Sequence, residues 1–110
     1  MLKPTLLLLL HHGPVHGYTL LEQLREFGLE EMNSSMIYRT LRDMEGKEWI
    51  TSTWDKKRAQ GPPRRVYRLA ALGDEVLGRY SRELQKTREA VGHFLDAYSR
   101  HMEEGEGEHH

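Results

Sequence analysis

The sequence predicts a mostly α-helical α+β protein with one small β-hairpin: three short helices, the hairpin, and then one long C-terminal helix. Apolar residues recur at helical spacing in three segments after a leucine-rich one, and two runs of β-branched and aromatic residues flank the turn signal Gly61-Pro62-Pro63. At 110 residues the chain fits one domain with a modest core, to which a partner subunit would add. The absence of cysteine excludes disulfides and thiolate chemistry and agrees with a cytoplasmic location.

Two short helices are expected near the N-terminus. The leucine-rich segment 2–10 is typical of a buried helix and ends before Gly13-Pro14, a pair that stops a helix. A second helix begins near His16 and has one apolar face, with Gly28 as its stop signal. The apolar run at 6–10 is far shorter than the roughly 20 residues that cross a bilayer, so no membrane partner is expected.

A third helix is expected after Asn33, a residue type that caps helices well. Its apolar stripe recurs at i, i+4 and i+7: Ile37, Leu41 and Met44. Arg39 and Arg42 lie away from that stripe, where an arginine fork can bond a guanine edge at two points or clamp a phosphate. The sequence therefore predicts that this helix reads DNA, although the same arginines also suit a merely solvated face.

Three more residues of the third helix are candidate DNA contacts. Ser34 and Ser35 at its start can expose backbone donors to a phosphate, or they can simply cap the helix. Tyr38 lies beside the apolar stripe, so its ring can be half-buried while its hydroxyl reaches a phosphate. Structural packing alone explains Tyr38 equally well.

A strongly basic segment follows the third helix. Between positions 56 and 68 the chain has six basic residues and no acidic one: Lys56, Lys57, Arg58, Arg64, Arg65 and Arg68. Gly61-Pro62-Pro63 cannot continue a helix or a central strand, so a turn is expected between strands at 49–54 and 65–69. Two strands joined by a basic turn form a wing. Its cations are expected to contact phosphates or the minor groove; the alternative is a solvated loop.

The last helix is expected over residues 71–102, and its apolar positions follow a heptad pattern. About thirty helical residues span about 45 Å, longer than a small domain is wide, so a second copy is the expected cover for this stripe. The predicted homodimer interface comprises the apolar and aromatic seam residues Leu77, Tyr80, Leu84, Val91, Phe94 and Tyr98. The acidic, glycine-rich tail at 103–110 is expected to be disordered.

This order of elements is that of a winged helix-turn-helix followed by a dimerisation helix. The predicted division is a DNA-binding region at 1–70, the dimerisation helix at 71–102, and the tail. Without its four tail glutamates the chain has a net charge of about +3 instead of -1, which suits a nucleic-acid partner. The predicted contacts with a double-stranded DNA operator are Ser34, Ser35, Tyr38, Arg39, Arg42, Lys56, Lys57, Arg58, Arg64 and Arg65. The alternative is a winged-helix module that binds an acidic protein.

Three groups of residues carry a family resemblance. They are Leu6 to Leu10 followed by Gly13-Pro14-Val15-His16-Gly17-Tyr18, Ile37-Tyr38-Arg39-Thr40-Leu41 with Trp49-Ile50, and Gly61-Pro62-Pro63-Arg64-Arg65-Val66-Tyr67-Arg68-Leu69 before Leu72-Gly73. Together, over nearly the whole chain, they resemble the short members of the PadR family of bacterial winged-helix transcriptional regulators. The resemblance implies a repressor-like dimer on a pseudo-palindromic operator, often for detoxification, phenolic-acid or efflux genes. It also implies that the last helix packs against the first helix of the partner subunit.

The resemblance further implies a small aromatic or drug-like effector. Family members that bind flat aromatic drugs at the dimer centre use a tryptophan on the last helix, but here Trp49 and Trp54 both lie in the hairpin. Phe94 and Tyr98 are the candidate ligand-binding residues instead. Aromatic residues of a heptad seam are, however, more often plain packing residues.

No catalytic residue, metal site or cofactor is expected. His12 and His16 are four residues apart, but Gly13-Pro14 between them breaks the helix that would align such a pair of metal ligands. The sequence has no defensible nucleophile and base order, phosphate-cradling glycine loop or paired-carboxylate cleft. An enzyme is therefore not expected.

Overall fold

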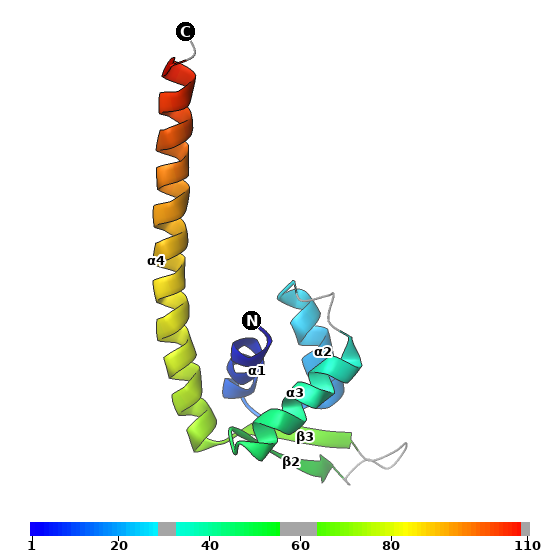
Figure 1. Ribbon diagram of the computed structural model, residues 1–110. Helices are drawn as coiled ribbons and strands as arrows, with labels where there is room; N and C mark the ends of the chain where they lie inside the picture. Colours follow the sequence, from blue (N-terminus) through cyan, green and yellow to red (C-terminus); the bar gives the residue numbers. More distant parts are fainter. Residues whose placement is uncertain (29–32, 56–63, 109–110) are drawn as a thin grey trace. The chain divides into compact units, whose positions relative to one another are not determined.

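The computed structural model describes residues 1–28, 33–55 and 64–108, with side chains as far as Gly105 (Figure 1). The elements in chain order are α1 (Leu2–His11), β1 (Val15–His16), α2 (Gly17–Glu26), α3 (Ser34–Gly46), β2 (Ile50–Asp55), β3 (Arg64–Leu69) and α4 (Ala71–Glu108). This order confirms the predicted α+β class, with a helix-turn-helix, a wing and a long last helix. The chain divides into two compact units, Met1–Gly78 and Arg79–His110.

The core of the first unit lies where α1, α2 and α3 meet the sheet. The largest fully buried side chains there are Leu6, Leu7, Leu10, Leu20, Leu24, Leu41, Met44 and Ile50. The leucine run buries α1 on most sides, whereas α2 and α3 each bury a single stripe. Burial of an aliphatic side chain contributes about 1.5–3 kcal/mol, so this core holds the helix-turn-helix in place.

Both ends of α3 follow from local features of the chain. The Asn33 side chain accepts a hydrogen bond of 2.8 Å from the backbone N–H of Met36, which confirms the predicted cap. Glu48 has a left-handed φ of 64° just past the helix end, where the chain turns toward β2. The predicted stripe is buried, as its spacing requires: Ile37, Leu41 and Met44.

The sheet has three antiparallel strands in the order β1-β3-β2, of which β2 and β3 are labelled in Figure 1. The wing strands β2 and β3 pair in register, from Ile50 opposite Leu69 to Asp55 opposite Arg64. The predicted hairpin is therefore confirmed, with strand ends that differ from the prediction by one residue. The turn between the two strands lies outside the described residues.

The strand β1 is the element that the sequence does not predict. It has only two residues, which is too short to show an alternating pattern. It pairs with β3, with Val15 opposite Tyr67 and His16 opposite Val66. This pairing brings the first turn of α2 beside the wing strands.

The start of α4 approaches the backbone of the hairpin closely. A Cβ on Gly73 would collide with the carbonyl of Trp49, which also accepts a hydrogen bond of 3.0 Å from the N–H of Ala70. The helix continues to Glu108, so residues 103–108 are helical where the sequence predicts a disordered tail. Extension of an existing helix needs no new nucleus, and glutamate has a high helix propensity. Within the described parts of the chain, no helix combines the length and apolarity needed to cross a membrane.

Candidate nucleic-acid interface

The solvent-facing side of α3 carries the predicted recognition residues. Four of them are exposed: Ser34, Ser35, Arg39 and Arg42. Tyr38 is half-buried, in agreement with its position beside the apolar stripe. Arg39 and Arg42 are three residues apart and so are neighbours on one face of the helix. Neither guanidinium forms an ion pair with any residue that the structure describes.

The C-terminal half of α3 is tied to α1 by a small charged cluster. The Asp43 carboxylate lies 3.0 Å from the Lys47 Nζ and 3.3 Å from the Lys3 Nζ. Hydrogen bonds from Lys47 and then Lys3 lower the pKa of Asp43. Both ammonium groups also lie over the Trp49 ring, 5.1 Å and 5.8 Å from its centroid. These surface contacts link the C-terminal half of α3 to α1 and to Trp49.

The described part of the wing presents two exposed arginines at the start of β3, Arg64 and Arg65. The guanidinium carbon of Arg65 lies 4.8 Å from the centroid of the Trp54 ring on β2. This stacking restricts the Arg65 side chain without neutralising its charge. The other predicted wing contacts, Lys56, Lys57 and Arg58, lie outside the described residues.

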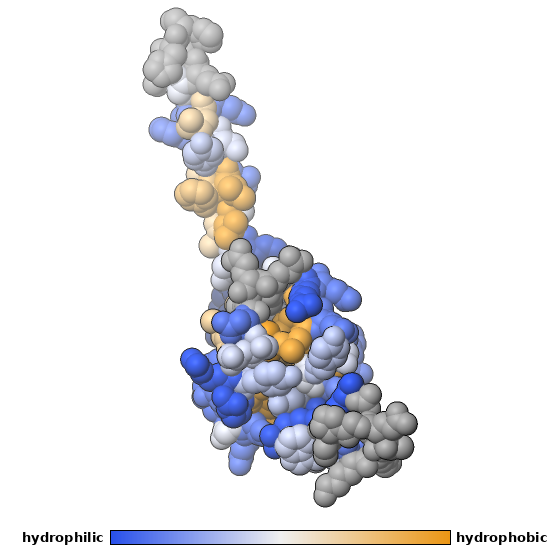
Figure 2. Space-filling model, turned by 90° about the vertical axis from the view of Figure 1, so that its right-hand side faces the viewer, coloured by the Kyte–Doolittle hydropathy of each residue, from blue (hydrophilic) through white to orange (hydrophobic). Residues whose placement is uncertain are grey.

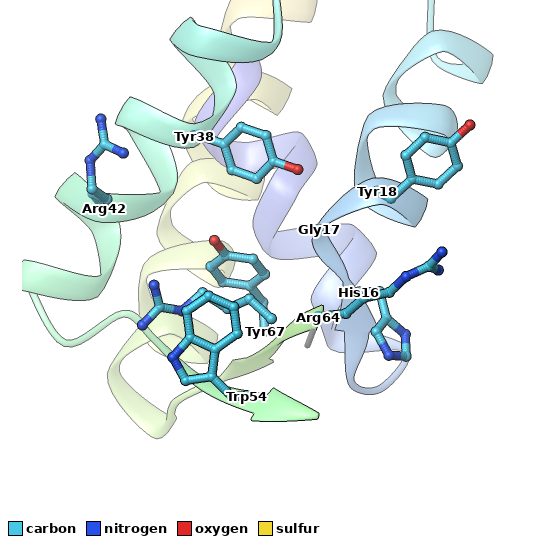
Figure 3. Close-up of a pocket in the computed structure, with 9 residues that line it drawn as sticks. His16, Gly17, Tyr18, Tyr38, Arg42, Trp54, Arg64 and Tyr67 are labelled. Atoms are coloured by element: carbon cyan, nitrogen blue, oxygen red, sulfur yellow. The ribbon is translucent and has the colours of Figure 1, made fainter. Parts of the chain in front are cut away.

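A pocket of about 430 Å³ opens between α2, α3 and the wing strands (Figure 3). It is lined by His16, Gly17, Tyr18, Tyr38, Arg42, Trp54, Arg64, Arg65 and Tyr67. In Figure 3 the rings of Tyr38, Tyr67 and Trp54 gather at its centre. Four lining residues are tyrosine or tryptophan, three are arginine and none is acidic. We call this site the wing-base pocket, and its lining suits an anionic ligand.

Gly17 is the residue against which the tyrosine rings pack. A Cβ on Gly17 would lie 3.2 Å from Cε1 of Tyr38 and 3.3 Å from Cε2 of Tyr67, closer than ordinary van der Waals contact. The preceding residue, His16, makes no side-chain capping bond to α2. Its Nε2 lies instead 3.1 Å from Oδ2 of Asp55. The first-turn N–H groups of α2, which have no partner within the helix, therefore begin beside the two tyrosines.

Tyr67 is the most deeply buried tyrosine of the wing-base pocket, with 4% of its surface exposed. Burial raises the pKa of its phenol, against the opposing effect of the nearby Arg65 charge. The hydroxyl is therefore protonated at neutral pH and available as a hydrogen-bond donor. No residue that the structure describes forms a hydrogen bond with it.

The wing-base pocket unites four of the predicted DNA contacts: Tyr38, Arg42, Arg64 and Arg65. The other described candidates lie on the open surface of α3 and do not line it: Ser34, Ser35 and Arg39. The sequence does not single out Trp54, Tyr67 or the segment His16-Gly17-Tyr18 as site residues, because they meet only through the pairing of β1 with β3. The sequence signal that points to them is a glycine and tyrosine pair at a helix start, with aromatic residues in both wing strands.

The second unit exposes an apolar stripe along α4, and Figure 2 shows hydrophobic side chains gathered on this helix. The large apolar side chains between positions 84 and 102 are 36–67% exposed: Leu84, Val91, Phe94, Leu95, Tyr98 and Met102. Leu77 and Tyr80, predicted for the same interface, are half-buried. The rings of Phe94 and Tyr98 stack with their centroids 6.4 Å apart. Leu95 and Met102 lie outside the predicted seam and widen the stripe.

Comparison with known proteins agrees with the winged-helix geometry. Residues 6–79 match the model of the "Transcriptional regulator PadR-like family". No curated protein sequence matches the chain. The matched segment includes the helix-turn-helix, the wing and the beginning of α4.

Solved structures share both the fold and a part of the sequence. A crystal structure described as a conserved protein of unknown function and potential transcriptional factor is 32% identical, with a TM-score of 0.81. The match covers 93% of this chain and 90% of that protein. A PadR-like transcriptional regulator from Bacillus cereus is 26% identical, with a TM-score of 0.76 and coverage of 86% and 90%. A PadR-like transcription factor from Bacteroides fragilis is 28% identical, with a TM-score of 0.73 and coverage of 86% and 89%.

Proposed function

Since the chain belongs to the transcriptional regulator PadR-like family, we propose that it is a dimeric, operator-specific repressor that a small aromatic or drug-like effector releases from DNA. Family membership makes it a DNA-binding regulator of transcription. The dimer, the repressor role and the effector are the further content of the proposal. The family is one of regulators, so we propose no catalytic role. We also propose a cytoplasmic location, because the protein would act on DNA.

The observation that carries the proposal is the cationic surface formed by α3 and the wing. Arg39 and Arg42 project from a capped helix, and Arg64 and Arg65 lie on the neighbouring wing strand. A helix of this kind fits the major groove, where an arginine fork reads a guanine edge. The wing arginines add affinity and register through phosphates, which carry no sequence information directly. We therefore assign base reading to Arg39 and phosphate contacts to Arg64.

The dimer that we propose is formed by α4. A row of exposed apolar side chains from Leu84 to Met102 is unusual for a monomer in water and is typical of an interface. A second copy supplies the matching heptad seam, and two-fold symmetry then places two recognition helices about 34 Å apart, one turn of DNA. This spacing predicts a pseudo-palindromic operator.

The effector site that we propose is the stacked pair Phe94 and Tyr98. Both rings are more than half exposed, at 67% and 55%, and they offer a flat aromatic surface within the proposed dimer seam. A planar molecule bound there would bias the arrangement of the two copies and so their fit to the operator. A titration of planar aromatic compounds, with operator release as the readout, tests this assignment. Equal operator affinity at saturation would remove the effector role for that compound.

The DNA-binding assignment is tested by selection from a pool of random duplexes. We expect enrichment of a pseudo-palindrome whose half-sites lie about 10 base pairs apart. The logarithm of the binding constant should then fall linearly with the logarithm of the salt concentration. Failure to enrich any sequence, together with specific capture of an acidic protein partner, would favour a protein-interaction module instead.

A further inference from the structure

We propose that the wing-base pocket binds one backbone phosphate of the DNA, with Arg42, Arg64 and the Tyr67 hydroxyl as its donors. This inference rests on the proposed DNA-binding function and assigns one of its phosphate contacts to the wing-base pocket. It adds His16, Gly17 and Tyr67, which the sequence does not predict, to the nucleic-acid interface. The pocket lies wholly within the first unit.

The chemistry of the lining selects an acceptor-rich anion. Arginine and tryptophan side chains can only donate hydrogen bonds, and the lining contains three arginines and one tryptophan. Arg42 and Arg64 have no ion-pair partner among the residues that the structure describes. A phosphate offers oxygens that accept from several donors at once, and an arginine fork matches its geometry. A ligand rich in donors, or a cation, does not fit this set.

The Tyr67 hydroxyl offers a donor to a ligand independently of the arginines. It belongs to a residue with only 4% of its surface exposed, is protonated at neutral pH, and is unbonded to any described residue. The residue lines the open wing-base pocket, so a bound acceptor can use this donor. Figure 3 shows the hydroxyl directed into the space between Tyr38 and Arg42. An acceptor placed there reaches donors from β3 and α3 together.

The first turn of α2 supplies further donors at the same place. Gly17 and Tyr18 line the pocket, and no side chain from His16 caps the helix. The positive end of a helix dipole and its free N–H groups favour an anion. Because Gly17 has no side chain, Tyr38 and Tyr67 pack directly against this turn. Glycine at this position therefore keeps the helix start and the tyrosines within reach of one phosphate.

A DNA phosphate is favoured over a free small anion because of what surrounds the pocket. Arg39, on the exposed face of the same helix as Arg42, is placed to meet the bases, so a backbone segment crossing from α3 to the wing passes the pocket. The volume of about 430 Å³ exceeds that of a phosphate alone, and the aromatic walls leave room for the adjoining sugar. The wing-base pocket is thus continuous with the proposed reading surface.

The test is a methylphosphonate scan of the selected operator. Each phosphate of one half-site is replaced in turn by a neutral methylphosphonate, and binding is measured by fluorescence anisotropy at constant salt. We expect one position at which the wild-type protein loses roughly tenfold in affinity, the scale of a hydrogen-bonded charge contact. Tyr67→Phe and Arg64→Gln should each weaken binding to the unmodified operator by a similar factor. Methylphosphonate at that one position should then cause no further loss of affinity in these variants. Arg82→Gln, which removes an exposed arginine of α4, should keep the full wild-type loss there.

A second readout separates binding from folding. Tyr67→Phe removes a hydroxyl that has no hydrogen-bond partner among the described residues, so its melting temperature should equal or exceed that of the wild type. If both pocket variants still bind the operator and lose as much affinity as the wild type at every methylphosphonate position, the pocket does not bind a DNA phosphate. That result would overturn the inference and leave the proposed function standing. The absence of any selected duplex would overturn both. Inorganic phosphate could also displace the duplex at constant ionic strength while no methylphosphonate position distinguishes the pocket variants from the wild type. That result would identify a site for small anions and would also overturn the proposal.

Discussion

The two units of this chain present different candidate binding surfaces. In the first, unpaired arginines stand on a packed core of leucine, isoleucine and methionine. In the second, a single helix exposes apolar side chains from Leu84 to Met102. Exposed charge costs little in water, whereas each Å² of apolar surface left uncovered forgoes about 25 cal/mol. We infer that the first unit binds a polyanion, and that the second pairs with a second copy of the chain.

The largest effect is expected from Leu84→Asp in α4. An unpaired carboxylate in the proposed seam would cost about 3–5 kcal/mol of association free energy, because a buried charge without a partner is strongly destabilising. Sedimentation velocity should show a monomer at concentrations where the wild type is a dimer. Arg82→Asp brings the same carboxylate to an exposed position outside the seam and should leave the dimer intact. A dimer that survives Leu84→Asp would contradict the role of the stripe.

The next effect concerns the recognition helix. Arg39→Ala should cost about 1–3 kcal/mol on the operator and relax preference at one base position. Arg64→Ala should weaken binding to all sequences alike. It should also reduce the magnitude of the slope of the logarithm of the binding constant against the logarithm of the salt concentration by about one unit, the value of one phosphate contact. Competition assays against single-base operator variants measure both quantities. If both variants lose discrimination between operator bases equally, base reading cannot be assigned to α3 and phosphate contact to the wing.

A smaller effect is expected at the start of α3. Asn33→Ala removes the side-chain acceptor for the Met36 N–H and should lower the free energy of unfolding by about 1 kcal/mol. Asn33→Asp retains an acceptor at the same place and is the matched control. Thermal denaturation of both variants measures the difference. Equal stability of Asn33→Ala and the wild type would show that the cap does not support the recognition helix.

The smallest effect is a pH dependence from the cluster of Lys3, Asp43 and Lys47. The pKa of Asp43 is lower in the folded protein than its ordinary value, because the two lysines stabilise the carboxylate. Its contribution to stability is therefore present above the ordinary pKa and is lost as the pH falls through the folded value. Asp43→Asn should remove this part of the acid sensitivity, measured as the change in melting temperature between neutral and acidic pH. An unchanged acid sensitivity would rule out the cluster as an anchor that titrates.

Much of the first unit could be predicted because its signals are local. The Asn33 cap, the stripe from Ile37 to Met44 and the Gly61-Pro62-Pro63 turn each follow from residues close together in the sequence. The predicted and observed wing strands differ by one residue at their ends. Family resemblance placed the same motifs in one fold, and the family match agrees with it.

The wing-base pocket could be predicted only in part because it depends on long-range pairing. Its arginines stand out as charges, but His16 and Tyr67 meet through a strand of two residues that leaves no pattern in the sequence. The helical end of α4 was also beyond the sequence pattern, since glycine and clustered acidic charge favour disorder while an established helix favours its own extension. Contacts set by distant segments therefore account for most of what the sequence does not predict.

The central claim, that one unit binds DNA and the other pairs two copies, is tested most directly by stoichiometry on DNA. Sedimentation equilibrium is carried out with the selected operator and with a duplex that contains a single half-site, for the wild type and for Leu84→Asp. The account predicts two wild-type chains on the operator, and one Leu84→Asp chain on the half-site with its salt dependence retained. A single wild-type chain saturating the operator, or a folded Leu84→Asp chain with no affinity for the half-site, would contradict it.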